Sequence, residues 1–151
     1  MIREITEKDT SIILKKAKFF WEEIKGNDLL GDLSLAGFSN FLKVSFAKDS
    51  IVGWIYEENN IQHGAILFQK DFIFLANKTC LSEVFWYMSP EKRHTTMSYK
   101  LIKEAEKYAQ NNNIQLIMMG CMQNPRPERL IEFYNKIGYK GTQYQFFKKI
   151  S

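Results

Sequence analysis

The sequence predicts a single α/β (α+β) domain, residues 1–151, with a mixed, mostly antiparallel sheet flanked by helices. Strand-like and helix-like periodicities alternate in the order β, α, α, β, β, β, α, β, α, β. Residues 57–60, Glu-Glu-Asn-Asn, are a hairpin signature, which favours antiparallel neighbours in the first half. A strand–helix–strand crossover in the second half requires a parallel pair, and the chain is long enough to close one core.

The first half of the chain is expected to hold three strands and two helices. Ile13, Ala17 and Ile24 recur on one face of a helix, and Ser34 is the candidate N-cap of a second helix. Residues 71–79 fit either an extension of the third strand or a loop over the sheet. The expected elements are a strand over 2–5, helices over about 10–25 and from 35, and strands over 51–56 and 61–68.

The stretch Leu81–Ala109 organises the second half. Residues 81–88 are aromatic and apolar, as in a buried strand, and Pro90 ends this strand because proline cannot continue a central ladder. After the polar turn, apolar residues recur at helical spacing as far as Ala109. A helix N-terminus carries unpaired N–H groups and a partial positive charge, so the turn before this helix is a candidate phosphate-binding site.

Three further elements complete the chain. The run Asn111–Asn113 stops the helix, and residues 114–120 are expected to form the next buried strand. A short helix over 128–137 ends at Gly138, and a strand over 143–149 is expected to close the chain.

Charge is distributed unevenly along the chain, and its distribution indicates which kind of ligand the chain could bind. Residues 1–87 carry ten basic and twelve acidic side chains, whereas residues 88–151 carry eleven basic and five acidic ones. The basic half contains the candidate phosphate turn, as a polyanionic ligand would favour. A basic solvated surface and nucleic-acid binding are other interpretations of the same charge.

Composition is that of a globular domain without a membrane segment. No apolar run is long enough to span a bilayer, and the N-terminal residues lack the hydrophobic region of a signal peptide, so a cytoplasmic location is expected. Cys80 and Cys121 do not have the spacing of metal ligands. We interpret them as reduced, buried structural thiols, and no metal site is predicted.

Two motifs resemble those of the GNAT acetyltransferases. In the first, residues 93–98 match the acyl-CoA-binding signature Q/R-x-x-G-x-G/A, with Arg93 present but Thr96 and Ser98 in place of the glycines. Glycine lets the backbone approach a ligand closely, so this is a departure from the family. In the second, Asn124 followed by residues 133–139, FYNKIGY, is similar to the family's N…FY-x-K-x-G-F/Y segment.

This resemblance implies the GNAT fold, with acetyl-CoA as co-substrate in a cleft where the fourth and fifth strands splay apart. The acetyl group would pass directly to a primary amine of a small molecule or a protein. The residues that the resemblance assigns to acetyl-CoA are Trp86, Tyr87 and Met88 for the pantetheine arm, Arg93, His94, Thr95, Thr96, Met97 and Ser98 for the pyrophosphate, and Asn124.

Amide acetylation also needs a base for the amine and a proton for the leaving thiolate. The resemblance makes Tyr134 the candidate general acid, although it could equally be a core residue on the helical face of Ile131 and Ile137. Glu83 lies in an otherwise apolar strand, where burial would raise its pKa, and is the candidate general base. His63 is a second candidate base, but a surface position is expected for it.

Two other functions stay open at this point. A catalytically inactive domain of the same fold, binding another macromolecule, is motivated by Thr96 and Ser98. A small nucleic-acid-binding protein would bind with strong salt dependence and without CoA, but the chain has no recognisable nucleic-acid motif. A homodimer is compatible with the sequence, which does not identify the acceptor.

Overall fold

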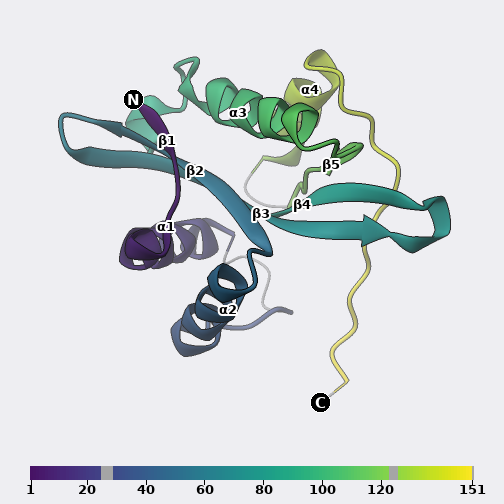
Figure 1. The fold of residues 1–151 in the computed structure, drawn as a ribbon, viewed down its shortest axis with the longest axis horizontal. Helices are drawn as coiled ribbons and strands as arrows, with labels where there is room; N and C mark the ends of the chain where they lie inside the picture. The colour runs from purple at the N-terminus through teal and green to yellow at the C-terminus, as the bar shows by residue number, and fades with distance from the viewer. Residues whose placement is uncertain (25–28, 123–125, 151) are drawn as a thin grey trace.

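The computed structural model describes residues 1–24, 29–122 and 126–150. It has one five-stranded sheet, with α1 and α2 on one face and α3 and α4 on the other (Figure 1). The elements are β1 (Ile2–Glu4), α1 (Thr10–Glu23), α2 (Leu35–Ala47), β2 (Ile51–Glu58), β3 (Ile61–Ile73), β4 (Lys78–Met88), α3 (Met97–Asn111), β5 (Leu116–Met118) and α4 (Pro127–Lys136).

The sheet confirms the predicted fold class. The strand order is β1-β2-β3-β4-β5, antiparallel throughout except for the parallel pair β4–β5. Pairing between β4 and β5 ends at Ser82 and Met118, whereas β4 continues to Met88. The last part of β4 therefore has a partner, β3, on only one of its edges, and the two strands separate there.

Each face of the sheet buries its own apolar core. The core under α3 and α4 includes Trp54, Phe68 and Leu101, and the core under α1 and α2 includes Ile13, Leu42 and Phe85. Burial of such side chains stabilises the fold by about 25 cal/mol for each Å² of apolar surface removed from water. The two cores hold β4 from both sides, which fixes the strand that carries the candidate site.

Local sequence signals explain the turns. The Ser34 hydroxyl accepts a hydrogen bond from the Gly37 N–H at 3.1 Å, as expected of an N-cap. Asn59 and Asn60 have φ values of 52° and 62°, the left-handed pair of a type I′ hairpin. Residues 71–79, open from sequence, form the end of β3, a turn with left-handed Asn77 and the start of β4.

A β-bulge in β4 changes which side chains share a face. Leu67 of β3 is opposite Phe85, but the next residue, Phe68, is opposite Glu83, so Val84 has no partner. In a regular strand Glu83 and Trp86 would lie on opposite faces. Because of the extra residue, both lie on the face covered by α3 and α4.

The closing strand over 143–149 is not formed, so that prediction was wrong. Residues 141–150 belong to no helix or strand and are exposed. In Figure 1 this segment extends from α4 beyond the edge of the sheet. Strand-forming side chains alone are not sufficient, because an isolated strand needs a neighbouring edge for its backbone hydrogen bonds. In the described ranges, no helix is long and apolar enough to cross a membrane.

Candidate active site

Glu83 reaches across the gap between β4 and β5. Its carboxylate accepts a hydrogen bond from the Gly120 N–H at 2.7 Å. The side chain keeps some exposed area but is densely surrounded by protein atoms, and this burial raises its pKa to about 7. The Gly120 hydrogen bond opposes the shift but is the smaller effect. A carboxylate with this pKa exchanges protons readily near neutral pH.

Tyr134 approaches the same point from α4. Its side chain is buried, and its hydroxyl donates a hydrogen bond to the Gly120 carbonyl at 2.9 Å. Burial, and then the nearby Glu83 carboxylate, raise the pKa of Tyr134 above that of a free phenol. The hydroxyl therefore stays protonated and remains a hydrogen-bond donor at neutral pH. It also belongs to the core, so packing and chemistry are compatible roles.

Gly120 is the residue that the sequence interpretation missed. Its N–H donates to Glu83 and its carbonyl accepts from Tyr134, so one residue links the two predicted catalytic side chains. A glycine shortly after a strand is an unspecific signal, and nothing in the sequence pairs it with these side chains. Two residues predicted for catalysis on separate elements are thus brought together.

Cys121 lies beside this group and is exposed, so its predicted burial was wrong, whereas Cys80 is buried as expected. Partial burial and the neighbouring carboxylates Glu83 and Glu128 raise the pKa of the Cys121 thiol. It is consequently a weaker nucleophile than an ordinary thiol, because the thiolate is the reactive form. Both cysteines are free.

The end of β4 offers backbone groups at its open edge. The Ser89 N–H donates to the His63 carbonyl of β3. Because backbone N–H and C=O groups point to alternate edges along a strand, those of Tyr87 face β3, and those of Trp86 and Met88 face the gap. Of the three residues predicted to hold pantetheine, Trp86 and Met88 thus present their backbone to the gap. The Tyr87 ring packs under α1, against Phe19.

The indole of Trp86 has a buried donor without a partner. Its ring lies against Phe133 and Tyr134 of α4, at centroid distances of 6.0 and 6.3 Å. The Nε1 atom is buried and, among the described residues, makes no hydrogen bond. Such a group is costly to leave unpaired, and in a cleft it commonly marks a place for a ligand or an ordered water.

The predicted phosphate turn leads directly into α3. The backbone N–H groups of His94, Thr96, Ser98 and Tyr99 donate to no atom of the ranges that the structure covers. Thr95 is used locally instead, since its hydroxyl donates to the Lys92 carbonyl and accepts from the Met97 N–H. The Met97 side chain packs on the core. The free N–H groups leave the turn able to bind an anion.

Arg93 is placed differently from the other residues of the turn. Its guanidinium pairs with Glu23 of α1, donates to the Met88 carbonyl at 2.8 Å and lies over the Tyr87 ring. It thus connects the phosphate turn to α1. To bind a phosphate, the Arg93 guanidinium would have to leave Glu23. The new pair would replace the old one in kind, because carboxylate and phosphate both form charge-assisted hydrogen bonds with arginine.

The surface position expected for His63 was wrong. Its side chain is 11% exposed and its Nδ1 lies 3.2 Å from the Glu91 carboxylate, near the ring of Tyr56. The chain turns from β4 into residues 89–91 over it, which the hairpin sequence did not reveal. Asn124, the remaining predicted site residue, lies outside the described residues.

A hollow of about 540 Å³ lies away from this site, at the other end of β4. It is open to solvent and is lined by Phe72, Cys80 and Tyr108, among others. None of the predicted site residues lines this hollow, so it lies apart from the candidate catalytic residues.

Comparison with solved structures identifies the fold. The structure is similar over 100% of the chain to a GCN5-related N-acetyltransferase from Ralstonia eutropha (99% of that chain, 16% identity, TM-score 0.78). It is similar over 99% of its length to a predicted acetyltransferase with acetyl-CoA from Clostridium acetobutylicum (96%, 19% identity, TM-score 0.73).

A third similar structure is AAC(6′)-Iy in complex with the bisubstrate analogue CoA-S-monomethyl-acetylneamine (100% of this chain, 97% of that one, 13% identity, TM-score 0.74). The sequence itself matches no family model and no curated protein. The chain has the GNAT acetyltransferase fold. At these identities the similarity defines the fold, and the activity has to be argued from the site.

Proposed function

We propose that the protein is an acetyl-CoA-dependent N-acetyltransferase that acts on a primary amine of a small molecule or protein in the cytoplasm. The observation that carries this proposal is the Glu83–Gly120–Tyr134 arrangement at the point where β4 and β5 separate. In this arrangement a carboxylate with a pKa near neutrality and a protonated phenol both hydrogen-bond to the backbone of Gly120, next to the unpaired edge of β4.

Acetyl-CoA would bind along this edge. The pantetheine amides would pair with the backbone groups of Trp86 and with the Met88 N–H, much as an additional strand would, whereas the Met88 carbonyl already accepts a hydrogen bond from Arg93. The pyrophosphate would accept hydrogen bonds from the free N–H groups of the turn before α3, with Arg93 and His94 supplying charge or further donors. Asn124, from the family resemblance, is the remaining proposed contact to the pantetheine arm.

The chemistry would then proceed by direct transfer. Ionised Glu83 removes a proton from the acceptor ammonium, directly or through water, and the free amine attacks the thioester carbonyl. The tetrahedral intermediate collapses by breaking the C–S bond, and the Tyr134 hydroxyl turns from Gly120 to donate its proton to the leaving sulfur. The extra proton on the new amide nitrogen is then released and returns Tyr134 to the phenol, so that CoA leaves as the thiol. A buried, protonated phenol suits a thiolate leaving group when the two are in contact.

We expect Thr96→Gly to leave acetyl-CoA affinity equal or higher, because Thr96 is exposed and its side chain makes no capping hydrogen bond. Isothermal titration calorimetry would measure this, with Thr142→Gly as the same exchange far from the turn. A clear loss of affinity in Thr96→Gly alone would show that the hydroxyl is a ligand. Thr96 and Ser98 also motivate the second candidate function, an inactive binding domain, which predicts no acetyl-CoA binding in either protein.

We expect Trp86→Phe to weaken acetyl-CoA binding by about 5- to 10-fold, the value of one hydrogen bond of roughly 1 kcal/mol, because the unpartnered indole N–H becomes a donor to the bound ligand. Trp21→Phe is the matched control. The Trp21 indole already donates to the Gly31 carbonyl at 3.0 Å, so its loss should change stability and not affinity. Equal affinity in Trp86→Phe and the parent protein would remove this contact from the proposal.

The proposed activity is tested by measuring free CoA thiol released from acetyl-CoA in the presence of a panel of primary amines, peptides and aminoglycosides. Release that depends on one amine, with the acetylated product found by mass spectrometry, is the expected result. No release of thiol with any amine of the panel, together with no binding of acetyl-CoA, would favour the inactive domain.

A further inference from the structure

One ion pair joins the two layers of helices that cover the sheet. Arg93 belongs to the turn before α3, whereas its partner Glu23 is the last residue of α1, which lies on the opposite face (Figure 1). In the part of the chain that the structure describes, no other ion pair links α1 to another element. This pair therefore connects α1 directly to the proposed pyrophosphate site.

Three contacts fix the position of the Arg93 side chain. The guanidinium pairs with Glu23, and its Nε–H donates to the Met88 carbonyl at 2.8 Å. It also lies over the Tyr87 ring, at 5.6 Å from the ring centroid. All three partners belong to α1 or to β4, so the positive charge of Arg93 is used within the protein.

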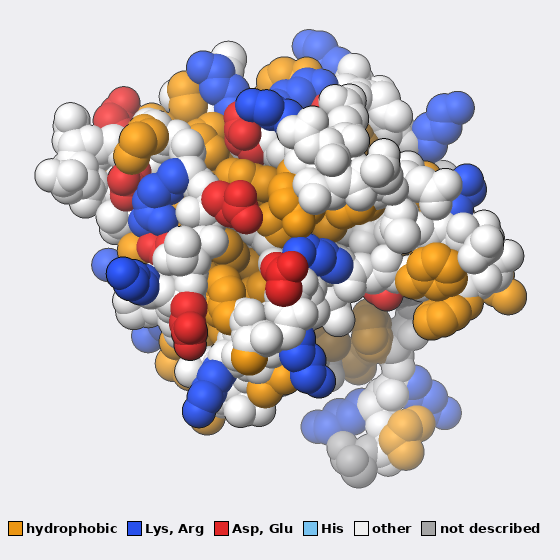
Figure 2. Space-filling model, viewed as in Figure 1, with side chains coloured by type: hydrophobic (Ala, Val, Ile, Leu, Met, Phe, Trp, Pro, Cys, Tyr) orange, Lys and Arg blue, Asp and Glu red, His pale blue; other side chains and the backbone are white. Residues whose placement is uncertain are grey.

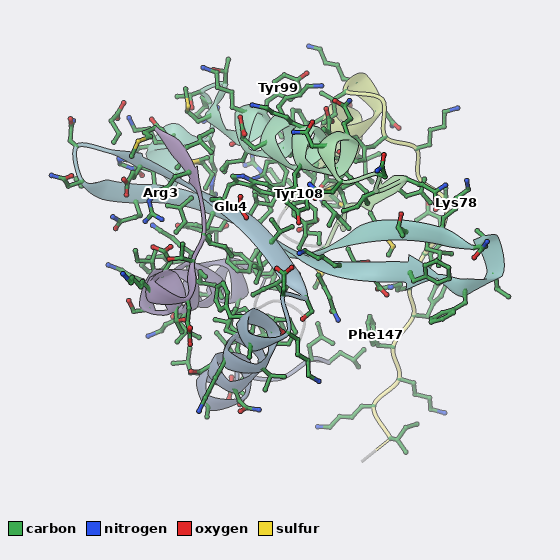
Figure 3. All side chains as sticks on the ribbon, in the orientation of Figure 1. Arg3, Glu4, Lys78, Tyr99, Tyr108 and Phe147 are labelled. Carbon is green, nitrogen blue, oxygen red and sulfur yellow. The ribbon has the colours of Figure 1, made fainter. Side chains whose placement is uncertain are left out.

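This position of Arg93 occupies two groups that the proposed acetyl-CoA site needs. The Met88 carbonyl faces the gap beside β4, where a pantetheine amide would donate to it. The guanidinium is the side chain of the turn best suited to a pyrophosphate. By contrast, backbone N–H groups of the turn are free, including that of Tyr99, which Figure 3 labels on α3. The Arg93 side chain is thus the part of the site that has to move.

The pair of Arg93 with Glu23 is open to exchange because neither side chain is buried. They are 38% and 34% exposed, and water competes for both charges, so the pair adds little free energy. A pyrophosphate offers more oxygens and more charge than one carboxylate. Figure 2 shows acidic and basic side chains interspersed over the face in view, so an anion meets local pairs of charges there. A single freed arginine then contributes measurably to the binding of a polyanion.

We infer that Glu23 is a positioning residue of the acetyl-CoA site, which holds Arg93 away from the ligand until acetyl-CoA displaces it. This role rests on the proposed function, because it concerns the same site. Displacement lets the guanidinium pair with the pyrophosphate and leaves the Met88 carbonyl free for a pantetheine amide. The broken pair lowers the affinity for acetyl-CoA, and each binding event releases the end of α1 from the turn.

The first test is the acetyl-CoA affinity of Glu23→Gln, measured by calorimetric titration at low ionic strength. Glutamine keeps the length of the side chain and removes its charge, so affinity should rise by about 2- to 5-fold, the value of an exposed ion pair. Glu22→Gln is the matched control and should bind like the parent protein. Glu22 is exposed on α1 and has no ion-pair partner within the described ranges. Equal or lower affinity in Glu23→Gln would overturn the inference.

A double-mutant cycle separates the ion pair from a general effect of charge. In an Arg93→Gln background, Glu23→Gln has no arginine to release, so the gain in affinity should disappear. With Arg93 present, the gain should also shrink between about 20 mM and about 500 mM NaCl, because salt screens exposed charges. A gain of the same size with and without Arg93 would contradict the proposed role of Glu23.

The same titrations distinguish failure of this role from failure of the proposed function. If neither the parent protein nor any variant binds acetyl-CoA, the proposed function is wrong and the role of Glu23 falls with it. If the parent protein binds acetyl-CoA and the cycle shows no coupling between Glu23 and Arg93, the cofactor site stands and Glu23 does not position Arg93.

Discussion

Replacing Glu83 with glutamine should lower the turnover of acetyl transfer by about 10²- to 10³-fold, the usual contribution of a general base. Glutamine keeps an oxygen that can accept the Gly120 hydrogen bond, so the substitution removes the base with little change of shape. In the parent protein, kcat/KM should rise with pH through an inflection near 7, where Glu83 ionises. That inflection should disappear in Glu83→Gln.

Glu83→Gln should lower turnover but raise the stability of the folded protein at alkaline pH. The folded protein raises the Glu83 pKa to about 7 from its ordinary value of 4.5, so it holds this proton more tightly than the unfolded chain does. Stability from this group is therefore complete below about pH 4.5 and is lost as the pH rises through 7. Glu83→Gln, which carries no charge, should be more stable than the parent at pH 8, by about 1–3 kcal/mol.

The matched control for both measurements is Glu132→Gln, because Glu132 is exposed on α4 and has no side-chain partner in the described ranges. Denaturant unfolding at pH 4.5 and 8 measures the stabilities, and a pH series of kcat/KM measures the ionisation. If Glu83→Gln kept parental turnover at every pH, Glu83 would not be the base.

Replacing Tyr134 with phenylalanine should lower turnover by about 10²-fold while acetyl-CoA affinity stays nearly constant, because the hydroxyl acts on the leaving sulfur. The Gly120 carbonyl also loses its donor, so the free energy of unfolding should fall by about 1–2 kcal/mol. Steady-state kinetics and calorimetric titration separate these effects.

Tyr139→Phe is the control for this substitution. Tyr139 packs against Tyr134, and its hydroxyl binds Glu106 rather than Gly120. The Tyr139→Phe variant should be less stable than the parent protein but should have the same turnover. Equal turnover in Tyr134→Phe and the parent protein would leave Tyr134 as a core residue only.

Much of the fold was predictable because its signals are local. The hairpin of Asn59 and Asn60, the Ser34 cap and the apolar face of α1 each depend on a few neighbouring residues. The predicted order of elements, apart from the last strand, matches the structure. The choice of Tyr134 from its motif, and of Glu83 from its position in an otherwise apolar strand, also named two side chains that meet at one residue.

What could not be predicted depends on distant contacts. The bulge at Val84 arises from the pairing of β3 with β4, and it determines that Glu83 and Trp86 share a face. The role of Gly120 requires β5 and α4 to be placed together, and the burial of His63 requires the turn after β4 to fold over it. The sequence over 143–149 has the composition of a strand, but a strand also needs a neighbouring edge for its backbone hydrogen bonds, and no local pattern shows whether one is present.

The proposed function requires that the protein binds acetyl-CoA, and thermal unfolding with and without acetyl-CoA tests this, with ATP at the same concentration as a polyanionic control. At about 100 times Kd, a ligand adds roughly 2.7 kcal/mol, which should raise Tm by about 5–10 °C for a domain of this size. A rise of this size with acetyl-CoA and not with ATP is the predicted result. No rise at millimolar acetyl-CoA would contradict the proposed function and would favour an inactive domain of the same fold.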